Sequence, residues 1–295
     1  MKKIYLILPI LAGIMFGSSG VFVRTLTQNG IDQTTLLFLR FSIAIIPILI
    51  AIILTDKKLF RIDLKDIPLF LVCALCIIGL NLCYNESMNT VPLSLAAVLL
   101  SLAPIYVLVS AYILFGEKIT ANKIICMALA IFGCVLMTGV LESDISNVPV
   151  LGIVFGIGAG LFWAIYLMAS KKSIENGKHT FTILIYSIIF ISIALIPFTD
   201  FGQINNFISI NPLLVAIFLI LHSTFSFALP YILSTVSLNY MDSGVSSILL
   251  SGAEPFAALF FGFIFYTEIP TLLMFIGFIL TIIAMMMLSR KESVD

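Results

Sequence analysis

Long apolar segments are the feature that most constrains this chain. A helix needs about 20 apolar residues to cross the roughly 30 Å hydrocarbon core of a bilayer, and ten segments reach or approach that length. They are residues 4–26, 34–54, 67–89, 92–114, 122–140, 150–170, 180–198, 212–237, 243–266 and 270–288. Since 61% of all residues are hydrophobic and 10% are charged, the sequence predicts an all-α integral membrane protein with ten transmembrane helices.

The connections between these helices are short. The longest has about a dozen residues and no apolar periodicity of its own, so we expect no extramembrane domain. Several predicted helices have proline near the first turn, where its missing N–H costs no hydrogen bond. These prolines are Pro68, Pro92, Pro149, Pro212 and Pro270. The first segment lacks a small-residue cleavage site, so we expect it to remain as an uncleaved helix.

Charge is distributed unequally between the two sides of the predicted bundle. Lys and Arg gather on one side, whereas the opposite connections carry acidic residues and no lysine. These acidic residues are Asp32, Glu142, Asp144, Asp200 and Glu268. Because short basic loops stay in the cytoplasm, we expect a multi-pass protein of the cell membrane with both termini cytoplasmic. Each half, residues 1–141 and 149–290, has five helices, so the halves should be inverted repeats.

A repeated pair of residues supports the duplication. Pro104 precedes Glu117 by thirteen residues, and Pro255 precedes Glu268 by the same spacing, 151 positions later. Transporters built from inverted repeats bind their substrates near the midplane, where the repeats meet. The pattern therefore favours transport between the two halves.

The residues around these pairs resemble the drug/metabolite transporter superfamily, in its EamA-like ten-helix branch. The matching residues are Phe16, Gly17, Ser18, Arg40, Phe41, Ser101, Leu102, Ala103, Pro104, Gly116, Glu117, Lys118, Ala253, Glu254, Pro255 and Glu268. Gly17 stands where the family often has tryptophan, and Thr267 replaces the glycine expected before Glu268. The resemblance covers nearly the whole chain. It implies a secondary carrier, commonly an exporter of amino acids or other small metabolites, whose central cavity opens to each side in turn.

Other functional classes lack their sequence signatures. No P-loop, His-Glu-x-x-His motif or nucleophile elbow is present, so we expect no enzyme, cofactor, metal or nucleic-acid partner. Cys73 and Cys76 have C-x-x-C spacing, but no second pair completes a metal site. The alternatives are a carrier of nucleotide sugars or phosphate esters, which should show more than one buried basic residue, and a membrane-embedded lipid-handling enzyme. A monomer or a homodimer is expected.

Glu254 is the leading candidate for substrate recognition. It lies a dozen residues into the ninth helix, and a charge at the midplane costs about 2.5–3.5 kcal/mol on insertion scales. Its counterpart in the first half is Ala103, and the adjacent Pro255 frees the carbonyl of Ser251. The alternative is a structural lock in which Glu254 accepts hydrogen bonds from neighbouring helices.

Arg40 is the second charged candidate, because it lies deeper in the second helix than snorkelling requires. Its guanidinium could bind a substrate carboxylate or form a fixed ion pair with Glu86 at the end of the third helix. A substrate with both an amine and a carboxylate would suit Glu254 and Arg40, so amino acids or related compounds are favoured. Glu254 could also carry a coupling proton.

Further polar and aromatic residues fall inside the predicted helices. They lie in the first, third, sixth and eighth helices, where each could line a cavity or serve packing. These candidates are Ser18, Asn81, Tyr84, Asn85, Trp163, Tyr166, His222 and Ser226. Together with Glu254 and Arg40 they form the predicted substrate site.

Proline and glycine mark places where the helices should bend or approach closely. Candidate kinks, several at matching positions of the two halves, are Pro47, Pro104, Pro197, Pro230 and Pro255. Glycines spaced by four, which permit close helix packing, are Gly13 and Gly17 in the first helix and Gly152, Gly156 and Gly160 in the sixth. We expect alternating access by rocking of the two five-helix halves.

Overall fold

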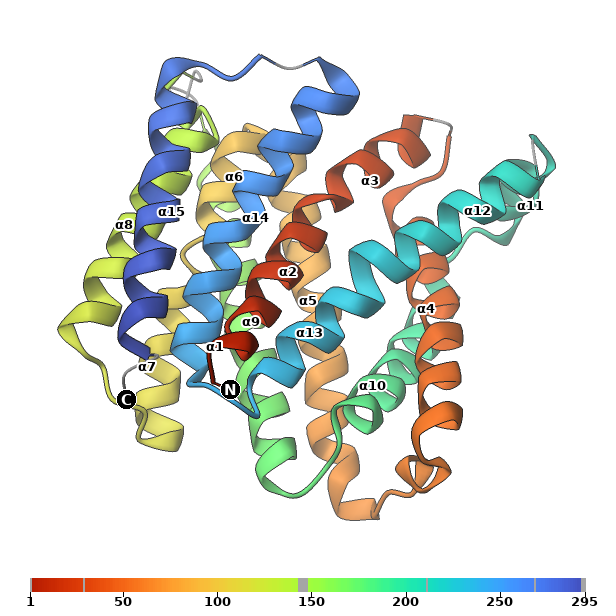
Figure 1. Cartoon of the computed structure of the whole chain (residues 1–295). Coiled ribbons are helices and arrows are strands. Elements are labelled where there is room, and N and C mark those ends of the chain that lie inside the picture. Colours follow the sequence, from red (N-terminus) through yellow and green to blue (C-terminus); the bar gives the residue numbers. More distant parts are fainter. Residues whose placement is uncertain (1, 29, 143–147, 211, 268, 293–295) are drawn as a thin grey trace.

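The protein is a bundle of helices (Figure 1). This computed structural model describes residues 2–28, 30–142, 148–210, 212–267 and 269–292. In that part of the chain, nine helical stretches are long and apolar enough to cross a membrane, and a shorter apolar helix covers Ala121–Met137. The predicted fold class, an all-α membrane protein, is confirmed.

The helices follow the predicted segments closely. The first half contains α1 (Lys2–Tyr5), α2 (Ile7–Gly17), α3 (Ser19–Gln28), α4 (Gln33–Thr55), α5 (Ile67–Thr90), α6 (Leu93–Leu100), α7 (Ala103–Phe115) and α8 (Ala121–Met137). The second half contains α9 (Val150–Glu175), α10 (Thr180–Leu195), α11 (Phe201–Ile210), α12 (Pro212–Ser223), α13 (Leu229–Ser237), α14 (Ser243–Tyr266) and α15 (Leu272–Glu292). Short 3₁₀ helices are η1 (Lys57–Phe60), η2 (Leu64–Asp66), η3 (Val140–Glu142) and η4 (Ile196–Phe198), and η5 (Thr224–Ala228) is a π-helix.

Two spans restart at proline. α7 begins after a break at Ser101 and Leu102 with Pro104 in its first turn, and α13 follows the π-helix η5 with Pro230 in its first turn. Proline is suited to a restart because the first turn of a helix leaves its N–H groups without partners. The π-helix itself is a form found frequently at functional sites.

The other predicted kink positions differ from one another. Pro47 and Pro255 lie inside the continuous helices α4 and α14. Pro197 lies in η4, after α10 has ended, and therefore not inside a continuous α-helix as expected. Proline ends α10 here because it cannot supply the next N–H of the helix. A hinge role for any of these residues stays a prediction.

The connection from α10 to α12 contains a helix, although the sequence analysis found no apolar periodicity there. It contains α11, whose Phe207 is buried in a small apolar cluster with Leu26, Leu36 and Leu219. The sequence analysis did not identify this ten-residue helix, because it docks through Phe207 without an apolar periodicity.

The two halves are packed into each other. α5 packs along α9, α8 along α15, α2 along α14 and α4 along α10, and each of these pairs joins one helix from either half. The glycine pattern explains one of the pairs: a Cβ atom on Gly17 would lie within 3 Å of the Glu254 carbonyl oxygen and of the Ala257 Cβ atom. The predicted close packing of Gly13 and Gly17 is confirmed.

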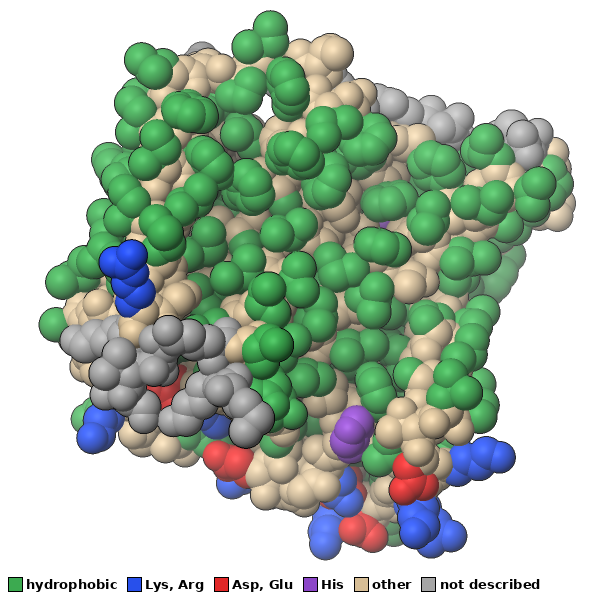
Figure 2. Space-filling model, in the orientation of Figure 1, with side chains coloured by type: hydrophobic (Ala, Val, Ile, Leu, Met, Phe, Trp, Pro, Cys, Tyr) green, Lys and Arg blue, Asp and Glu red, His purple; other side chains and the backbone are tan. Residues whose placement is uncertain are grey.

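Charged side chains gather at one end of the bundle, and apolar side chains cover its flanks (Figure 2). We call this end the basic end and define it by the connections 56–66, 116–120, 176–179 and 238–242. By the charge rule for membrane proteins it should face the cytoplasm.

Candidate functional site

A cavity lies between the two halves. It is bounded by the interrupted span α6–α7 and by residues of α2, α5, α9, α13 and α14. Its lining residues are Phe16, Leu80, Leu100, Ser101, Ala103, Trp163, Tyr231, Leu250, Ser251 and Glu254. Of the predicted site residues, Glu254 and Trp163 line this cavity, and their part in substrate binding stays a prediction.

Glu254 marks a change of environment along α14. Every residue from Ser243 to Ala253 is buried, whereas Glu254 and Pro255 are half-buried. Among the described residues, none donates a hydrogen bond to the Glu254 carboxylate or forms an ion pair with it, which disfavours the structural lock. The carboxylate faces a cavity in which a ligand could satisfy it.

Aromatic rings form one wall of the cavity. Phe16 packs edge-on against Trp163 and Tyr231, with ring centroids 5.7 and 5.2 Å apart. Tyr166 lies behind this wall: it is fully buried and its hydroxyl lies 2.7 Å from the Thr235 hydroxyl. Trp163 thus lines the cavity, and Tyr166, a predicted member of the site, supports it by packing.

Tyr231 is the site residue that sequence reasoning missed. It follows Pro230 at the restart of α13, which was the available signal. Its ring packs 4.5 Å from that of Phe227, over which the Arg40 guanidinium lies at 5.5 Å. Tyr231 also lines the cavity together with Glu254, so it connects the cavity with the surroundings of Arg40.

Arg40 is held outside the cavity lining. Its Nη2 atom donates a hydrogen bond to Asn81 Oδ1 at 2.5 Å, and its guanidinium lies over the rings of Phe41 and Phe227 at 5.2 and 5.5 Å. The suggested ion pair with Glu86 is not formed among the described residues, because Glu86 is exposed one turn beyond Asn81. Arg40 Nε has no hydrogen-bond partner in the described part of the chain.

The other site candidates on α5 are Asn81, Tyr84 and Asn85. Tyr84 and Asn85 are half-buried and do not line the cavity. The Asn81 side chain is held in place, because its Nδ2 atom donates to the Ile77 carbonyl at 2.8 Å while its Oδ1 atom accepts from Arg40.

Ser18, Ser226 and His222 take part in two contacts that connect the α2–α3 segment with α12 and η5. The Ser18 and Ser226 hydroxyls lie 3.4 Å apart, and the His222 ring stacks on Phe22 with centroids 5.5 Å apart. His222 is buried, and neither of its ring nitrogens has a hydrogen-bond partner among the described residues. None of the three lines the cavity, so their part in substrate binding stays a prediction.

The arrangement is suited to binding and not to bond breaking. It offers one unpaired carboxylate, an aromatic wall and a few hydroxyls from Ser101, Ser251 and Tyr231. Such a set can hold a small cation or amine but lacks a paired acid and base. In the described part of the chain, no three His, Cys, Asp or Glu residues lie together as metal ligands.

Comparison with known proteins agrees with this picture. The sequence profile of the EamA-like transporter family matches residues 3–139 and again residues 150–290. An uncharacterized transporter of Archaeoglobus fulgidus is 28% identical over 272 residues, which cover 91% of this chain and 90% of that protein. The threonine/homoserine exporter RhtA of Escherichia coli is 30% identical over 196 residues, 65% of this chain and 61% of RhtA.

The fold also occurs in a solved structure. A protein crystal structure superimposes with a TM-score of 0.77 at 14% sequence identity, covering 97% of this chain and 98% of the other. At that identity the likeness concerns the fold alone.

Proposed function

Because the chain belongs to the EamA-like transporter family, we propose that it is a secondary transporter that exports small polar metabolites, with amino acids or related compounds favoured, by alternating access. Members of this family and the named relatives are transporters, so a membrane-embedded enzyme is set aside. The protein is a multi-pass membrane protein, and we propose the cell membrane, with the basic end in the cytoplasm, as its location.

One observation carries the substrate proposal: Glu254 presents a carboxylate to the cavity without a hydrogen-bond partner among the described residues. A buried carboxylate is costly unless it is paired or protonated. An ammonium group of a substrate would pair with it, and the neighbouring rings of Phe16, Trp163 and Tyr231 would add cation–π attraction. The site therefore favours an amine at this position.

The cavity distinguishes this proposal from its within-class alternative. No Lys or Arg is among its described lining residues. A nucleotide sugar or phosphate ester would need basic groups against its phosphates, so a substrate without phosphate groups is favoured.

The substrate carboxylate is assigned to the side of Tyr231 and Arg40. Arg40 has no acidic partner among the described residues, and its guanidinium and the Tyr231 ring pack against the same residue, Phe227, so its positive charge would attract an anion at Tyr231. A carboxylate hydrogen-bonded to the Tyr231 hydroxyl would gain this attraction without displacing Asn81. Threonine and homoserine, which name the exporter RhtA, are the first compounds to test.

The test is counterflow of labelled threonine and homoserine into proteoliposomes that contain the purified chain. We expect uptake by the parent, a loss of about 100-fold or more in Glu254→Gln, which keeps the shape but not the charge, and unchanged uptake in the exposed control Glu175→Gln. If the parent takes up the substrate and Glu254→Gln takes it up equally well, Glu254 does not bind the substrate and the proposed site is wrong. A wider amino-acid panel separates a wrong compound from a wrong class.

Glu254 is also our candidate for proton coupling. If it exchanges a proton for the substrate amine, an imposed pH gradient should drive uptake by the parent. Because glutamine cannot take up a proton, Glu254→Gln should abolish any gradient-driven component. A parent that runs only downhill at every pH would contradict coupling and leave the binding site intact.

A further inference from the structure

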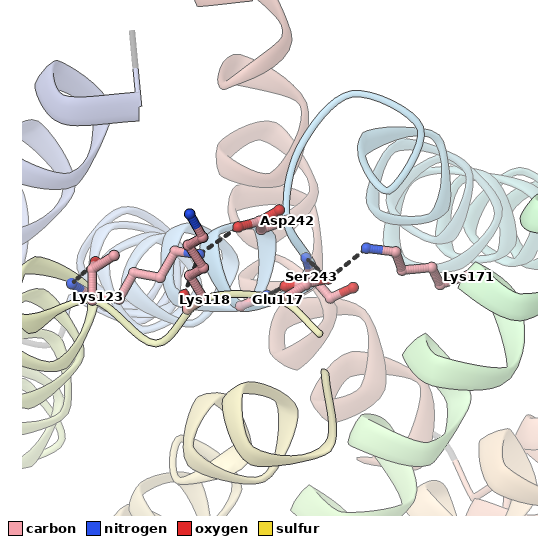
Figure 3. Close-up of polar contacts among 8 residues, drawn as sticks. Glu117, Lys118, Lys123, Lys171, Asp242 and Ser243 are labelled. Atoms are coloured by element: carbon pink, nitrogen blue, oxygen red, sulfur yellow. Dashed lines mark hydrogen bonds and ion pairs between the residues drawn. The ribbon is translucent and has the colours of Figure 1, made fainter. Parts of the chain in front are cut away.

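Four charged side chains join the two halves of the protein at the basic end (Figure 3). Glu117 and Lys123 come from the first half, and Lys171 and Asp242 from the second. We propose that this cluster, here called the latch, is the gate that holds the cavity closed at the basic end, so that its release is required to open it. The inference rests on the proposed alternating access but on no particular substrate.

Glu117 caps a helix that belongs to the other half. α7 ends at Gly116 in the left-handed region with φ of 67°, and this turn directs the next residue to α14. Glu117 Oε1 accepts a hydrogen bond from the Ser243 backbone N–H at 2.9 Å and one from Lys171 Nζ at 2.5 Å. Its Oε2 atom accepts from the Gly244 N–H at 3.3 Å. The first N–H groups of a helix need such partners.

Asp242, from the second half, pairs with a lysine of the first half. As the N-cap residue of α14 it would ordinarily accept from the first turn, but it makes no side-chain capping bond. It accepts instead from Lys123 Nζ on α8 at 2.5 Å, and the same Nζ donates to the Lys118 carbonyl at 3.0 Å. The Glu117 and Lys123 side chains are 6% and 3% exposed. Each acid therefore meets a lysine of the other half, and separating the halves would leave buried charges without partners.

The latch holds the start of α14, the helix that carries Glu254 in the cavity. Ser243 is eleven residues before Glu254, about 16 Å along an α-helix. Val245, Ile248 and Leu249 fill the intervening length and pack with Leu6 and Leu108 in one apolar cluster. A substrate can reach the basic end only if the start of α14 moves away from this cluster and from Glu117.

The inverted repeat shows that the latch is not duplicated. Glu268 matches Glu117 but lies outside the described residues. The residues that match Lys171, Asp242, Ser243 and Lys123 in the other half are, in that order, Gly20, Val91, Pro92 and Met274. None of these four carries a charge or a hydrogen-bond donor suited to this contact. Proline has no N–H to donate. Weakening the latch should therefore favour opening at the basic end specifically.

The test measures access to the cavity from each side. Ser251→Cys places a thiol in the cavity lining, and a membrane-impermeant maleimide is applied to right-side-out and to inverted vesicles, with the unsubstituted protein as the baseline for its native cysteines. We expect Glu117→Gln to raise labelling from the basic-end side about tenfold, as a population shift toward that state would, and to lower labelling from the other side.

Two controls make the result decisive. Lys172→Met with Glu175→Gln removes an exposed ion pair from the same end of α9 and should leave labelling unchanged. If Glu117→Gln does not fold, Lys123→Met with Asp242→Asn removes the other pair without leaving a buried charge and should give the same shift. Folded latch variants with unchanged labelling, or a control pair that shifts equally, would overturn the gate. Labelling requires no substrate, so failed counterflow would count only against the proposed function.

Discussion

Arg40 on α4 is held by Asn81 on α5, with 2.5 Å between Nη2 and Oδ1. The intramembrane cation is thus fixed by a neutral amide and keeps its full charge, which an acidic partner would neutralise. This arrangement is consistent with a site that attracts a carboxylate at Tyr231, whose ring packs against the same Phe227 side chain as the Arg40 guanidinium.

Asn81→Asp should therefore abolish transport without unfolding the protein. The new carboxylate would form a fixed ion pair with Arg40, which is strong where water is excluded, and would cancel the attraction for a substrate carboxylate. We expect counterflow to fall at least about tenfold, with no decrease in apparent melting temperature in detergent. Asn89→Asp, two turns further along α5 and exposed, is the control and should transport. Normal uptake by Asn81→Asp would show that Arg40 has no part in binding.

Gly17→Val should prevent α2 from packing on α14. A side chain at Gly17 would meet the Glu254 carbonyl oxygen and Ala257 within 3 Å, whereas at Gly20 it would meet no atom within 4 Å. Overpacking of this kind costs about 1–3 kcal/mol or more. We expect Gly17→Val to lose its monodisperse peak in size-exclusion chromatography and Gly20→Val to keep it. Equal profiles would mean that the α2–α14 contact is less tight than described.

Thr267→Gly should stabilise the protein, and Gly116→Thr should destabilise it. The two residues occupy matching positions at the ends of α14 and α7, both in the left-handed region, with φ of 55° and 67°. A β-branched residue pays about 1–2 kcal/mol for this conformation, and glycine does not. Thermal unfolding in detergent should move in opposite directions for the two variants. A shift of the same sign in both would contradict the strain at Thr267.

Lys178→Met should lower the melting temperature by the same few degrees at pH 6 and at pH 9. Lys178 donates to Asp66 at 2.6 Å, and this hydrogen bond raises the pKa of Lys178 above its ordinary value. A raised lysine pKa gives stability that is complete below the ordinary value of about 10.4 and is lost only as the pH rises through the raised one. The exposed Lys172→Met is the control and should have little effect. A loss that differs strongly between the two pH values would assign the stabilisation to another group.

Much of the fold could be predicted from the sequence because the bilayer limits the possible structures. Apolar length fixes helices that satisfy their own backbone, and the prolines at the helix starts and the Gly13 and Gly17 pair were placed correctly for local steric reasons. α11 was missed because its docking depends on Phe207 meeting residues far away in the chain. A short helix that docks through a single large side chain has no apolar periodicity by which it could be recognised in the sequence.

The site was less predictable. Glu254 could be identified because a charged side chain inside an apolar helix is costly in a membrane, and both the charge and its apolar neighbours can be read from the sequence. Tyr166 and Tyr231 are both tyrosines in apolar helices, yet one supports the cavity wall and the other lines it. Only the rotation of α9 and α13 against their neighbours decides between these roles, and packing sets that rotation.

The sequence by itself determined that this chain lies in a membrane as two related halves with one exceptional carboxylate, because hydrophobic length, proline and buried charge act locally. The tertiary structure decided which polar groups meet. It paired Arg40 with Asn81 and left Glu254 open to the cavity. It also joined Glu117 to the start of α14, because such contacts depend on the positions of helices that are distant in the chain.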